Sequence, residues 1–156
     1  MPIDVRRFGV GHRRPDGPPG TTGIEGQVIE SGRSGIVAEL AFSRRARITP
    51  HSNPNWTYFL VIEGGGWVGV GDERTRVAAG EAVVWPPDVL HAAWTDGAPM
   101  RAIVVEFLGP TLALPDVTEG VAIPIEAGPA SRGEGRLAPR GGDRPADDAH
   151  AEGEPA

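Results

Sequence analysis

Two histidines, His51 and His91, are the side chains of this sequence best suited to chemistry. An imidazole coordinates metal ions, and near pH 7 it also serves as an acid or a base. Each of the two stands at the entrance of a segment rich in β-branched and aromatic residues, which is typical of a strand. Three roles are therefore open: metal ligand, general acid or base, and polar strand-end residue bonded to Asn53, a carbonyl or water.

Composition excludes several other kinds of chemistry. The 156 residues include no cysteine, which excludes disulfides, thiolate nucleophiles and cysteine-bound metals. All 15 basic residues are arginines, so a Schiff-base lysine and the lysine of a phosphate-binding loop are excluded as well. The formal net charge of -6 disfavours nucleic acid as a partner. No apolar run approaches a membrane span and the first residues lack the apolar centre of a signal peptide, so we expect a cytoplasmic protein without membrane contact.

The elements that position the histidines belong to one domain, because 156 residues are too few for two of ordinary size. Residues 1–26 are crowded with glycine and proline and are expected to form a flexible N-terminal segment. We place the folded domain at residues 27–108 and an extended C-terminal extension that packs on it at residues 109–127. Residues 128–156 have almost no large apolar side chains and are expected to be a disordered tail.

The central region consists of short β-like segments separated by turns, and no window shows a helical period. This pattern predicts an all-β sandwich or small closed barrel. The run Gly64–Gly66 is interpreted as a tight turn that leaves a strand, since no helix or lysine follows to bind a phosphate. The expected strands are residues 26–31, 35–42, 46–51, 56–63, 66–71, 74–79, 81–86, 90–95 and 100–107.

Two expected strands, residues 56–63 and 100–107, are apolar on both faces. Because side chains alternate between the faces of a strand, both faces must be covered. One face is expected to line the barrel and the other to pack on a terminal strand or on a second subunit. The sequence therefore predicts a homodimer.

The stretch GEAVVWPPDVLHAAWT, residues 80–95, carries a recognisable motif. Gly80, Pro86 and His91 have the spacing of the second motif of the cupin family, with Asp88 where glycine is usual and Thr95 where asparagine is usual. Over residues 27–108 the chain resembles a small single-domain cupin. This resemblance implies a double-stranded β-helix, or jelly-roll, barrel.

The first cupin motif fits in spacing but not in chemistry. His51 stands where its first histidine belongs and Gly64 where its closing glycine belongs, but Asn53 replaces the second histidine and Thr57 the glutamate. Typical members hold a divalent metal with three histidines and a glutamate. The resemblance therefore implies either no cofactor or a weakly bound Fe, Mn, Ni or Zn ion on His51 and His91, with Asn53 as a poor third ligand.

The parity of the strands groups further side chains with the histidines. Phe59 and Val61 share the parity of His51, which gives the pocket an apolar floor, whereas Trp56 and Trp94 lie on the opposite parity. Most of the tryptophans are expected in the core. The predicted ligand-binding residues are His51, Asn53, Thr57, Phe59, Val61, His91 and Thr95.

Three kinds of function are compatible with such a site. The one we expect is binding of a small, largely apolar or carboxylated molecule by a sensor, carrier or accessory module. The alternative is an enzyme, either a metal-dependent oxygenase or a metal-free isomerase, epimerase or lyase with His51 or His91 as catalytic base. The third is a structural barrel whose interior is filled.

Overall fold

A computed structural model describes residues 2–107, and strands are the only regular elements in that range. No helix among these residues has the length and hydropathy needed to cross a membrane. The expected C-terminal extension and tail, residues 109–156, lie outside the described residues. The strands are β1 (Arg14–Pro15), β2 (Thr22–Ser31), β3 (Gly35–Arg47), β4 (Trp56–Val70), β5 (Glu73–Ala78), β6 (Ala82–Trp85), β7 (His91–Trp94) and β8 (Met100–Phe107).

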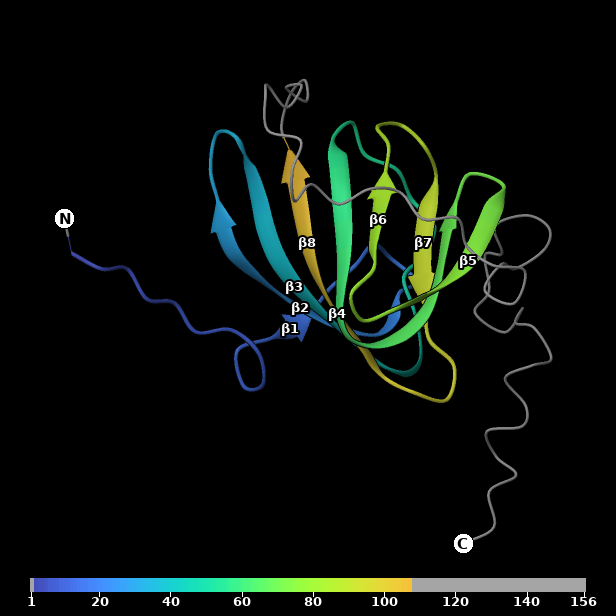
Figure 1. Ribbon diagram of the computed structural model, residues 1–156, viewed down its shortest axis with the longest axis horizontal. Coiled ribbons are helices and arrows are strands. Elements are labelled where there is room, and N and C mark those ends of the chain that lie inside the picture. Colours follow the sequence, from blue (N-terminus) through green and yellow to red (C-terminus); the bar gives the residue numbers. More distant parts are fainter. Residues whose placement is uncertain (1, 108–156) are drawn as a thin grey trace, which may run out of the picture.

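The longest strands are joined by segments far from them in sequence. Strand β8 lies between β3 and β4 and is antiparallel to both (Figure 1). Strand β7 also pairs with both strands: with β3 at its last residue, Arg47, and with the second half of β4. Strands β6 and β5 pair with the two halves of β4, and β2 pairs with β3. The sheet closes into a barrel, which confirms the predicted all-β barrel fold.

Strand β4 is continuous where the sequence predicted a turn. The interpretation of Gly64–Gly66 as a tight turn is wrong, because all three glycines lie inside the strand Trp56–Val70. The ladder to β8 shifts register between Val61 and Glu63, so a bulge rather than a turn redirects the chain. A Cβ on Gly66 would come within 2.5 Å of the Trp94 carbonyl oxygen. Glycine is required here because neighbouring backbones approach too closely for a side chain.

Two strands differ in extent from the predicted ones. Strand β2 begins at Thr22, before the expected domain start at residue 27, because Gly23 adopts a φ of 71° and lets the chain pass against Ala46. The expected strand 46–51 is the end of β3 and its continuation beside β7. There the Ile48 amide donates to the Ala93 carbonyl at 2.9 Å.

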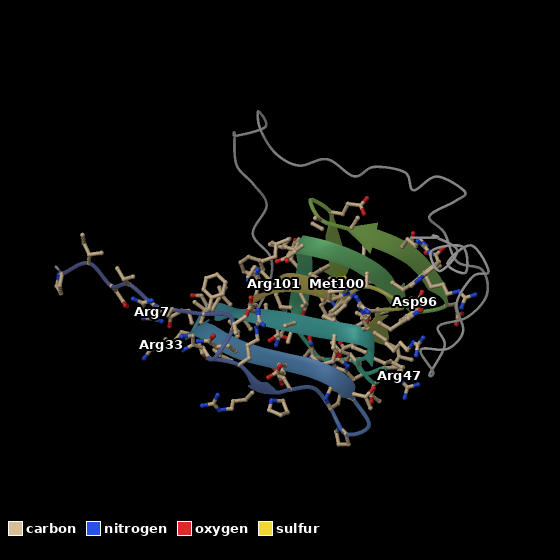
Figure 2. The ribbon with its side chains drawn as sticks, turned by 90° about the horizontal axis from the view of Figure 1, so that it is seen from below. Arg7, Arg33, Arg47, Asp96, Met100 and Arg101 are labelled. Atoms are coloured by element: carbon tan, nitrogen blue, oxygen red, sulfur yellow. The ribbon has the colours of Figure 1, made fainter. Side chains whose placement is uncertain are left out.

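The core consists of two groups of buried apolar side chains. The larger group lies inside the barrel and contains Phe42 and Phe59, whose rings meet edge to face at 5.9 Å. The smaller group contains Trp67, Ala92 and Trp94. Trp94 thus faces away from His91 and Ala93, as the strand parity predicts. Figure 2 shows Arg33, in the turn before β3, and Arg47, the last residue of β3, at opposite ends of this strand.

Candidate functional site

The structure brings His51 and His91 together. Their backbones form an isolated antiparallel bridge, in which each amide donates to the carbonyl of the other, at 3.0 Å from His51 and 2.8 Å from His91. The ring centroids are 4.5 Å apart with an interplanar angle of 66°. Residues 40 positions apart in sequence therefore form one imidazole pair, because β7 runs back along the segment that follows β3.

Each imidazole is oriented by a carbonyl two residues earlier in the chain. His51 Nδ1 lies 2.8 Å from the Thr49 carbonyl oxygen, and His91 Nδ1 lies 3.1 Å from that of Val89. A carbonyl only accepts, so Nδ1 carries the proton in the neutral form of each ring. The lone pair of each neutral ring is then on Nε2. Both histidines present a hydrogen-bond acceptor or metal-ligand atom of the same kind.

His91 is the more deeply buried member of the pair. It is 1% exposed, and its ring stacks on Trp85 with centroids 4.2 Å apart. Burial, and to a lesser extent the neighbouring charge of His51, lowers the pKa of His91 to about 4. Nε2 of His91 is buried and has no hydrogen-bond partner among residues 2–107. The site therefore contains a neutral imidazole with an unused acceptor.

A carboxylate from another strand joins the predicted polar residues. Glu106, on β8, is the register partner of Thr57 on β4. Its Oε1 accepts hydrogen bonds from Asn53 Nδ2 at 3.0 Å and from Thr57 Oγ1 at 3.4 Å. The Asn53 amide oxygen in turn accepts from the Asn55 backbone at 2.9 Å. Asn53 is thus held by contacts at both ends of its amide group, so neither of its polar atoms is a free metal ligand.

These side chains line a cavity of about 340 Å³ in the barrel. This volume is at the small end of the range for sites that bind small molecules, ~300–1,000 Å³. Seven of the lining residues are polar or aromatic. They are Asp16 after β1, His51 and Asn53 before β4, Thr57 on β4, Trp85 on β6, His91 on β7 and Glu106 on β8. The apolar part of the wall is Ile24, Val28, Ile36, Ala38, Leu40, Ile48 and Val104.

Three predicted ligand-binding residues lie elsewhere. Phe59 and Val61 belong to the barrel core and do not line the cavity; the Phe59 ring stacks on Trp85 with centroids 4.9 Å apart. Thr95 is 1% exposed, donates to the Ser43 carbonyl at 2.5 Å and accepts from the Ala46 amide at 2.9 Å. Thr95 therefore fastens β3 to the segment after β7 rather than lining the cavity.

Two lining residues, Glu106 and Trp85, were missed from the sequence. Glu106 shares the strand parity of Ala102 and Val104, so a carboxylate on an otherwise inward apolar face was the available signal. Nothing in the sequence separates Trp85 from the tryptophans expected in the core. Its place in the cavity depends on the approach of β6 to His91, which no local pattern reveals.

The donor set does not fit the four-ligand metal site that the resemblance implies. Only two imidazoles are available, and within residues 2–107 no three His, Asp or Glu side chains gather closely enough to hold a metal ion. Glu106 is engaged by Asn53 and Thr57. Two nitrogens completed by water bind a borderline dication less tightly than three histidines and a glutamate do.

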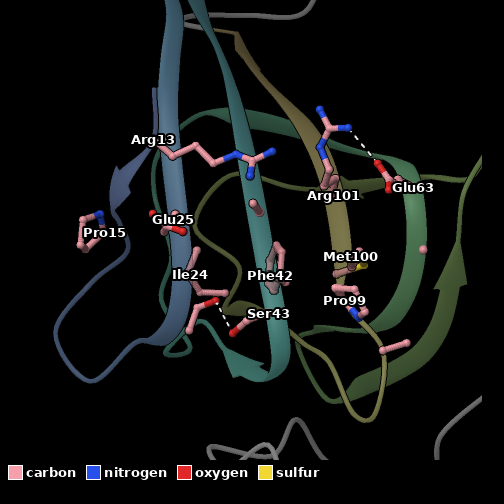
Figure 3. Close-up of a pocket in the computed structure, with 14 residues that line it drawn as sticks. Arg13, Pro15, Ile24, Glu25, Phe42, Ser43, Glu63, Pro99, Met100 and Arg101 are labelled. Atoms are coloured by element: carbon pink, nitrogen blue, oxygen red, sulfur yellow. Dashed lines mark hydrogen bonds and ion pairs between the residues drawn. The ribbon is translucent and has the colours of Figure 1, made fainter. Parts of the chain in front are cut away.

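A second and larger hollow, of about 680 Å³, lies on another part of the barrel and is not lined by either histidine (Figure 3). Arg13 and Arg101 extend over it, and each donates to the fully buried carboxylate of Glu39, at 2.8 and 3.0 Å from their Nε atoms. Arg101 also donates to the exposed Glu63 at 2.8 Å. This ion-pair cluster fixes the N-terminal segment to the sheet.

The backbone conformation of Asp88 explains why the second cupin motif usually has glycine at this position. Its φ is 60°, in the left-handed region that glycine adopts without cost and aspartate tolerates better than most residues. The glycine usual at this position and the aspartate found here therefore satisfy the same backbone demand in the turn before His91.

Comparison with known proteins agrees with this geometry. Residues 41–106 match a family model described as the cupin domain. No curated protein sequence matches the chain. The match contains the second half of β3, the whole of β4, β5, β6 and β7, and all of β8 except Phe107.

Solved structures share the fold at low sequence identity. The polyketide cyclase RemF from Streptomyces resistomycificus is similar with a TM-score of 0.61 and 20% identity, covering 76% of this chain and 89% of that one. KdgF from Halomonas sp. has a TM-score of 0.53 and 22% identity, with 59% and 86% covered. An RmlC-like cupin from Shewanella frigidimarina has a TM-score of 0.54 and 20% identity, and the likeness covers 66% of this chain and 91% of that one. At these identities the likeness concerns the fold alone.

Proposed function

Because the barrel of this chain is a small cupin domain, we propose that it binds a small molecule in the cavity that contains His51 and His91. The chain would act in the cytoplasm as a sensor, carrier or accessory module. The cavity has the size, the apolar wall and the few convergent polar groups that are typical of ligand sites.

The observation that carries the proposal is the unpartnered Nε2 of His91. A buried polar atom without a partner costs free energy, about 1–3 kcal/mol, so its retention requires a reason. A bound molecule that donates a hydrogen bond would supply the missing partner. The adjacent Nε2 of His51 offers a second acceptor in the same wall.

The proposal needs no metal. The two imidazoles could hold a divalent ion only weakly, with water completing the coordination shell. Nothing in the ligand-binding role depends on such an ion, because the acceptors, the apolar wall and the carboxylate belong to the chain itself.

The second candidate is a metal-free isomerase, epimerase or lyase. His51 is the better base of the pair, because it is only half-buried and its Nδ1 contact leaves Nε2 to take a proton. A pKa of about 4 makes His91 a weak base at neutral pH. The metal-dependent oxygenase is less well supported, since such chemistry uses a facial set of three strong ligands.

A test of the proposed function uses calorimetric titration and thermal shift with a broad panel of small metabolites. We expect at least one compound to bind with micromolar affinity and to raise Tm, and His91→Phe to weaken that binding about tenfold. No binding and no shift across the panel would support a filled structural barrel instead. Turnover lost in His51→Gln while affinity is kept would favour the enzyme.

The homodimer stays a prediction. Ile62 on β4, Val84 on β6 and Phe107 on β8 are exposed by 44%, 41% and 43%, and their strands are neighbours in the sheet. An apolar strip of this kind fits a second copy of the same strip across a twofold axis. Light scattering should give a dimer mass that Ile62→Lys reduces, and a monomer for the unmodified chain would refute the prediction.

A further inference from the structure

The wall of the histidine cavity is rich in hydrogen-bond acceptors and poor in positive charge. Among the described residues that line it, Asp16 and Glu106 carry carboxylates and none is an arginine. Arg13 and Arg101, the arginines of the ion-pair cluster, line the other hollow. That hollow also contains the carboxylates of Glu25 and Glu63, so of the two only the histidine cavity presents carboxylates without an arginine among the described residues.

The acceptors of this cavity are left unsatisfied within the described residues. Nε2 of His91 has no partner there, and the only hydrogen-bond contact of the His51 ring is through Nδ1. Glu106 uses Oε1 for both of its contacts, with Asn53 and Thr57, which leaves Oε2 as a further acceptor. The indole Nε1 of Trp85, a donor on the same wall, is also buried without a partner among the described residues. A ligand that fits this wall must therefore bring a hydrogen-bond donor for the imidazole, and a hydroxyl brings an acceptor for the indole as well.

We propose that the cavity selects neutral, hydroxyl-bearing aromatic molecules and rejects carboxylates of the same shape. This inference rests on the proposed function and narrows its ligand class, which at the sequence level included carboxylated molecules. A phenolic hydroxyl donates to an imidazole Nε2 or to the Glu106 carboxylate, while the ring occupies the apolar wall formed by residues such as Ile36, Leu40 and Val104.

A carboxylated ligand meets two penalties in the same place. Its charge would be desolvated against the apolar wall, and it would lie near Glu106 without a basic side chain to balance the two charges. Its ionised oxygens carry no proton, so they would leave Nε2 of His91 without a donor. A neutral ring without a hydroxyl avoids the repulsion but still leaves the acceptors unpartnered.

The test compares three probes of one shape on the unmodified full chain by isothermal titration calorimetry. These are 2-naphthol, 2-methoxynaphthalene and 2-naphthoate, which carry a donor, an acceptor without a donor, and a negative charge. We expect 2-naphthol to bind at least about tenfold more tightly than either of the others. Equal or tighter binding of 2-naphthoate would overturn the inference while the proposed function survives. Binding of none of the probes or metabolites would overturn both.

A matched pair of variants locates the selectivity. Glu106→Gln keeps an oxygen to accept from Asn53 and Thr57 but removes the charge, so it should tighten 2-naphthoate binding about tenfold and narrow its difference from 2-naphthol. Glu63→Gln removes the same charge outside this cavity and should change neither. An equal effect of the two variants would attribute the discrimination to net charge and refute a role for the cavity wall.

Discussion

Asn53 Nδ2 donates to Glu106 Oε1 over 3.0 Å, joining two residues that are 53 positions apart in sequence. The contact places a carboxylate beside the two positions where the first cupin motif would have a histidine and a glutamate. That carboxylate comes from β8 and is held by Asn53 and Thr57. The polar side of the cavity is thus a hydrogen-bonded wall rather than a set of free metal ligands.

Glu39→Gln should be strongly destabilising. Glu39 is fully buried and accepts hydrogen bonds from both Arg13 and Arg101, so the substitution leaves two buried or half-buried cations without their carboxylate. We expect a loss of about 3 kcal/mol in the free energy of unfolding, measured by urea denaturation. Glu63→Gln is the control: Glu63 also binds Arg101, but its side chain is 66% exposed, so the loss should stay below about 1 kcal/mol.

The same carboxylate makes stability sensitive to acid. The hydrogen bond from Arg13, helped by that from Arg101, lowers the pKa of Glu39 below its ordinary value of 4.5. A lowered carboxyl pKa contributes stability that is fully present above pH 4.5 and is lost as the pH falls through the folded-state value. Tm should therefore drop below pH 4.5 in the wild type and drop less in Glu39→Gln. Parallel curves for the two proteins would contradict this assignment.

The protonation of His91 affects stability over a less acidic pH range than that of Glu39. Its pKa falls from the ordinary 6.5 to about 4 on folding, so the unfolded chain takes up the proton first. The stability that neutral His91 contributes is complete above pH 6.5 and decreases as the pH falls toward 4. Thermal unfolding between pH 7 and 5 should show a smaller decrease of Tm in His91→Gln than in the wild type.

His12→Gln is the control for that titration, because His12 is an exposed histidine in the segment before β1. Its Tm should follow the wild-type curve between pH 7 and 5. If His91→Gln also follows the wild-type curve, the burial of His91 has no energetic consequence in solution.

The substitution His91→Phe should weaken ligand binding but leave stability nearly unchanged. His91→Phe keeps an aromatic ring on Trp85 and removes the unpartnered Nε2, but it also removes the donor to the Val89 carbonyl. These two effects oppose each other, so the free energy of unfolding should change by less than about 1 kcal/mol. Differential scanning calorimetry measures the change. A loss of several kcal/mol would make His91 a structural residue rather than one kept for a ligand.

Gly64→Ala should be costly, and Gly97→Ala should not. Gly64 has a φ of 71° inside β4, and a Cβ there would run into the Pro99 carbonyl oxygen. We expect a loss of about 2 kcal/mol or more, seen as a lower urea midpoint with an unchanged slope. A Cβ on Gly97 would meet nothing within 4 Å, so that variant should stay within about 1 kcal/mol of the wild type. A loss for Gly64→Ala as small as that for Gly97→Ala would mean that β4 tolerates a side chain at Gly64.

The sequence predicts the fold well because the strand signals are local. Alternating or doubly apolar segments such as residues 56–63 and 100–107 become strands of the barrel, and both histidines sit where the motif spacing places them. The turn predicted at residues 64–66 is wrong, because glycine occurs both in turns and where two backbones approach closely. Only the neighbouring strands decide between these two meanings.

The composition of the cavity was less predictable than the fold. Parity grouped Phe59 with His51, but parity does not tell how deep in a barrel a side chain lies, and Phe59 is covered by Trp85. Glu106 faces Thr57 through the register of β4 and β8, which depends on a bulge that leaves no clear mark in the sequence. Glu106 lies 53 positions after Asn53, so the sequence does not predict that its carboxylate belongs to the cavity.

The position of β8 between β3 and β4 also determines when the barrel forms. Until residues 100–107 are available, both of the long strands have an unpaired edge. During synthesis the chain must therefore wait for its last described strand before the sheet closes, and the open edges are exposed to other nascent chains meanwhile. Pairing of segments so distant in sequence costs more loop-closure entropy than a local hairpin does, so we expect closure by β8 to be slower than formation of the hairpins.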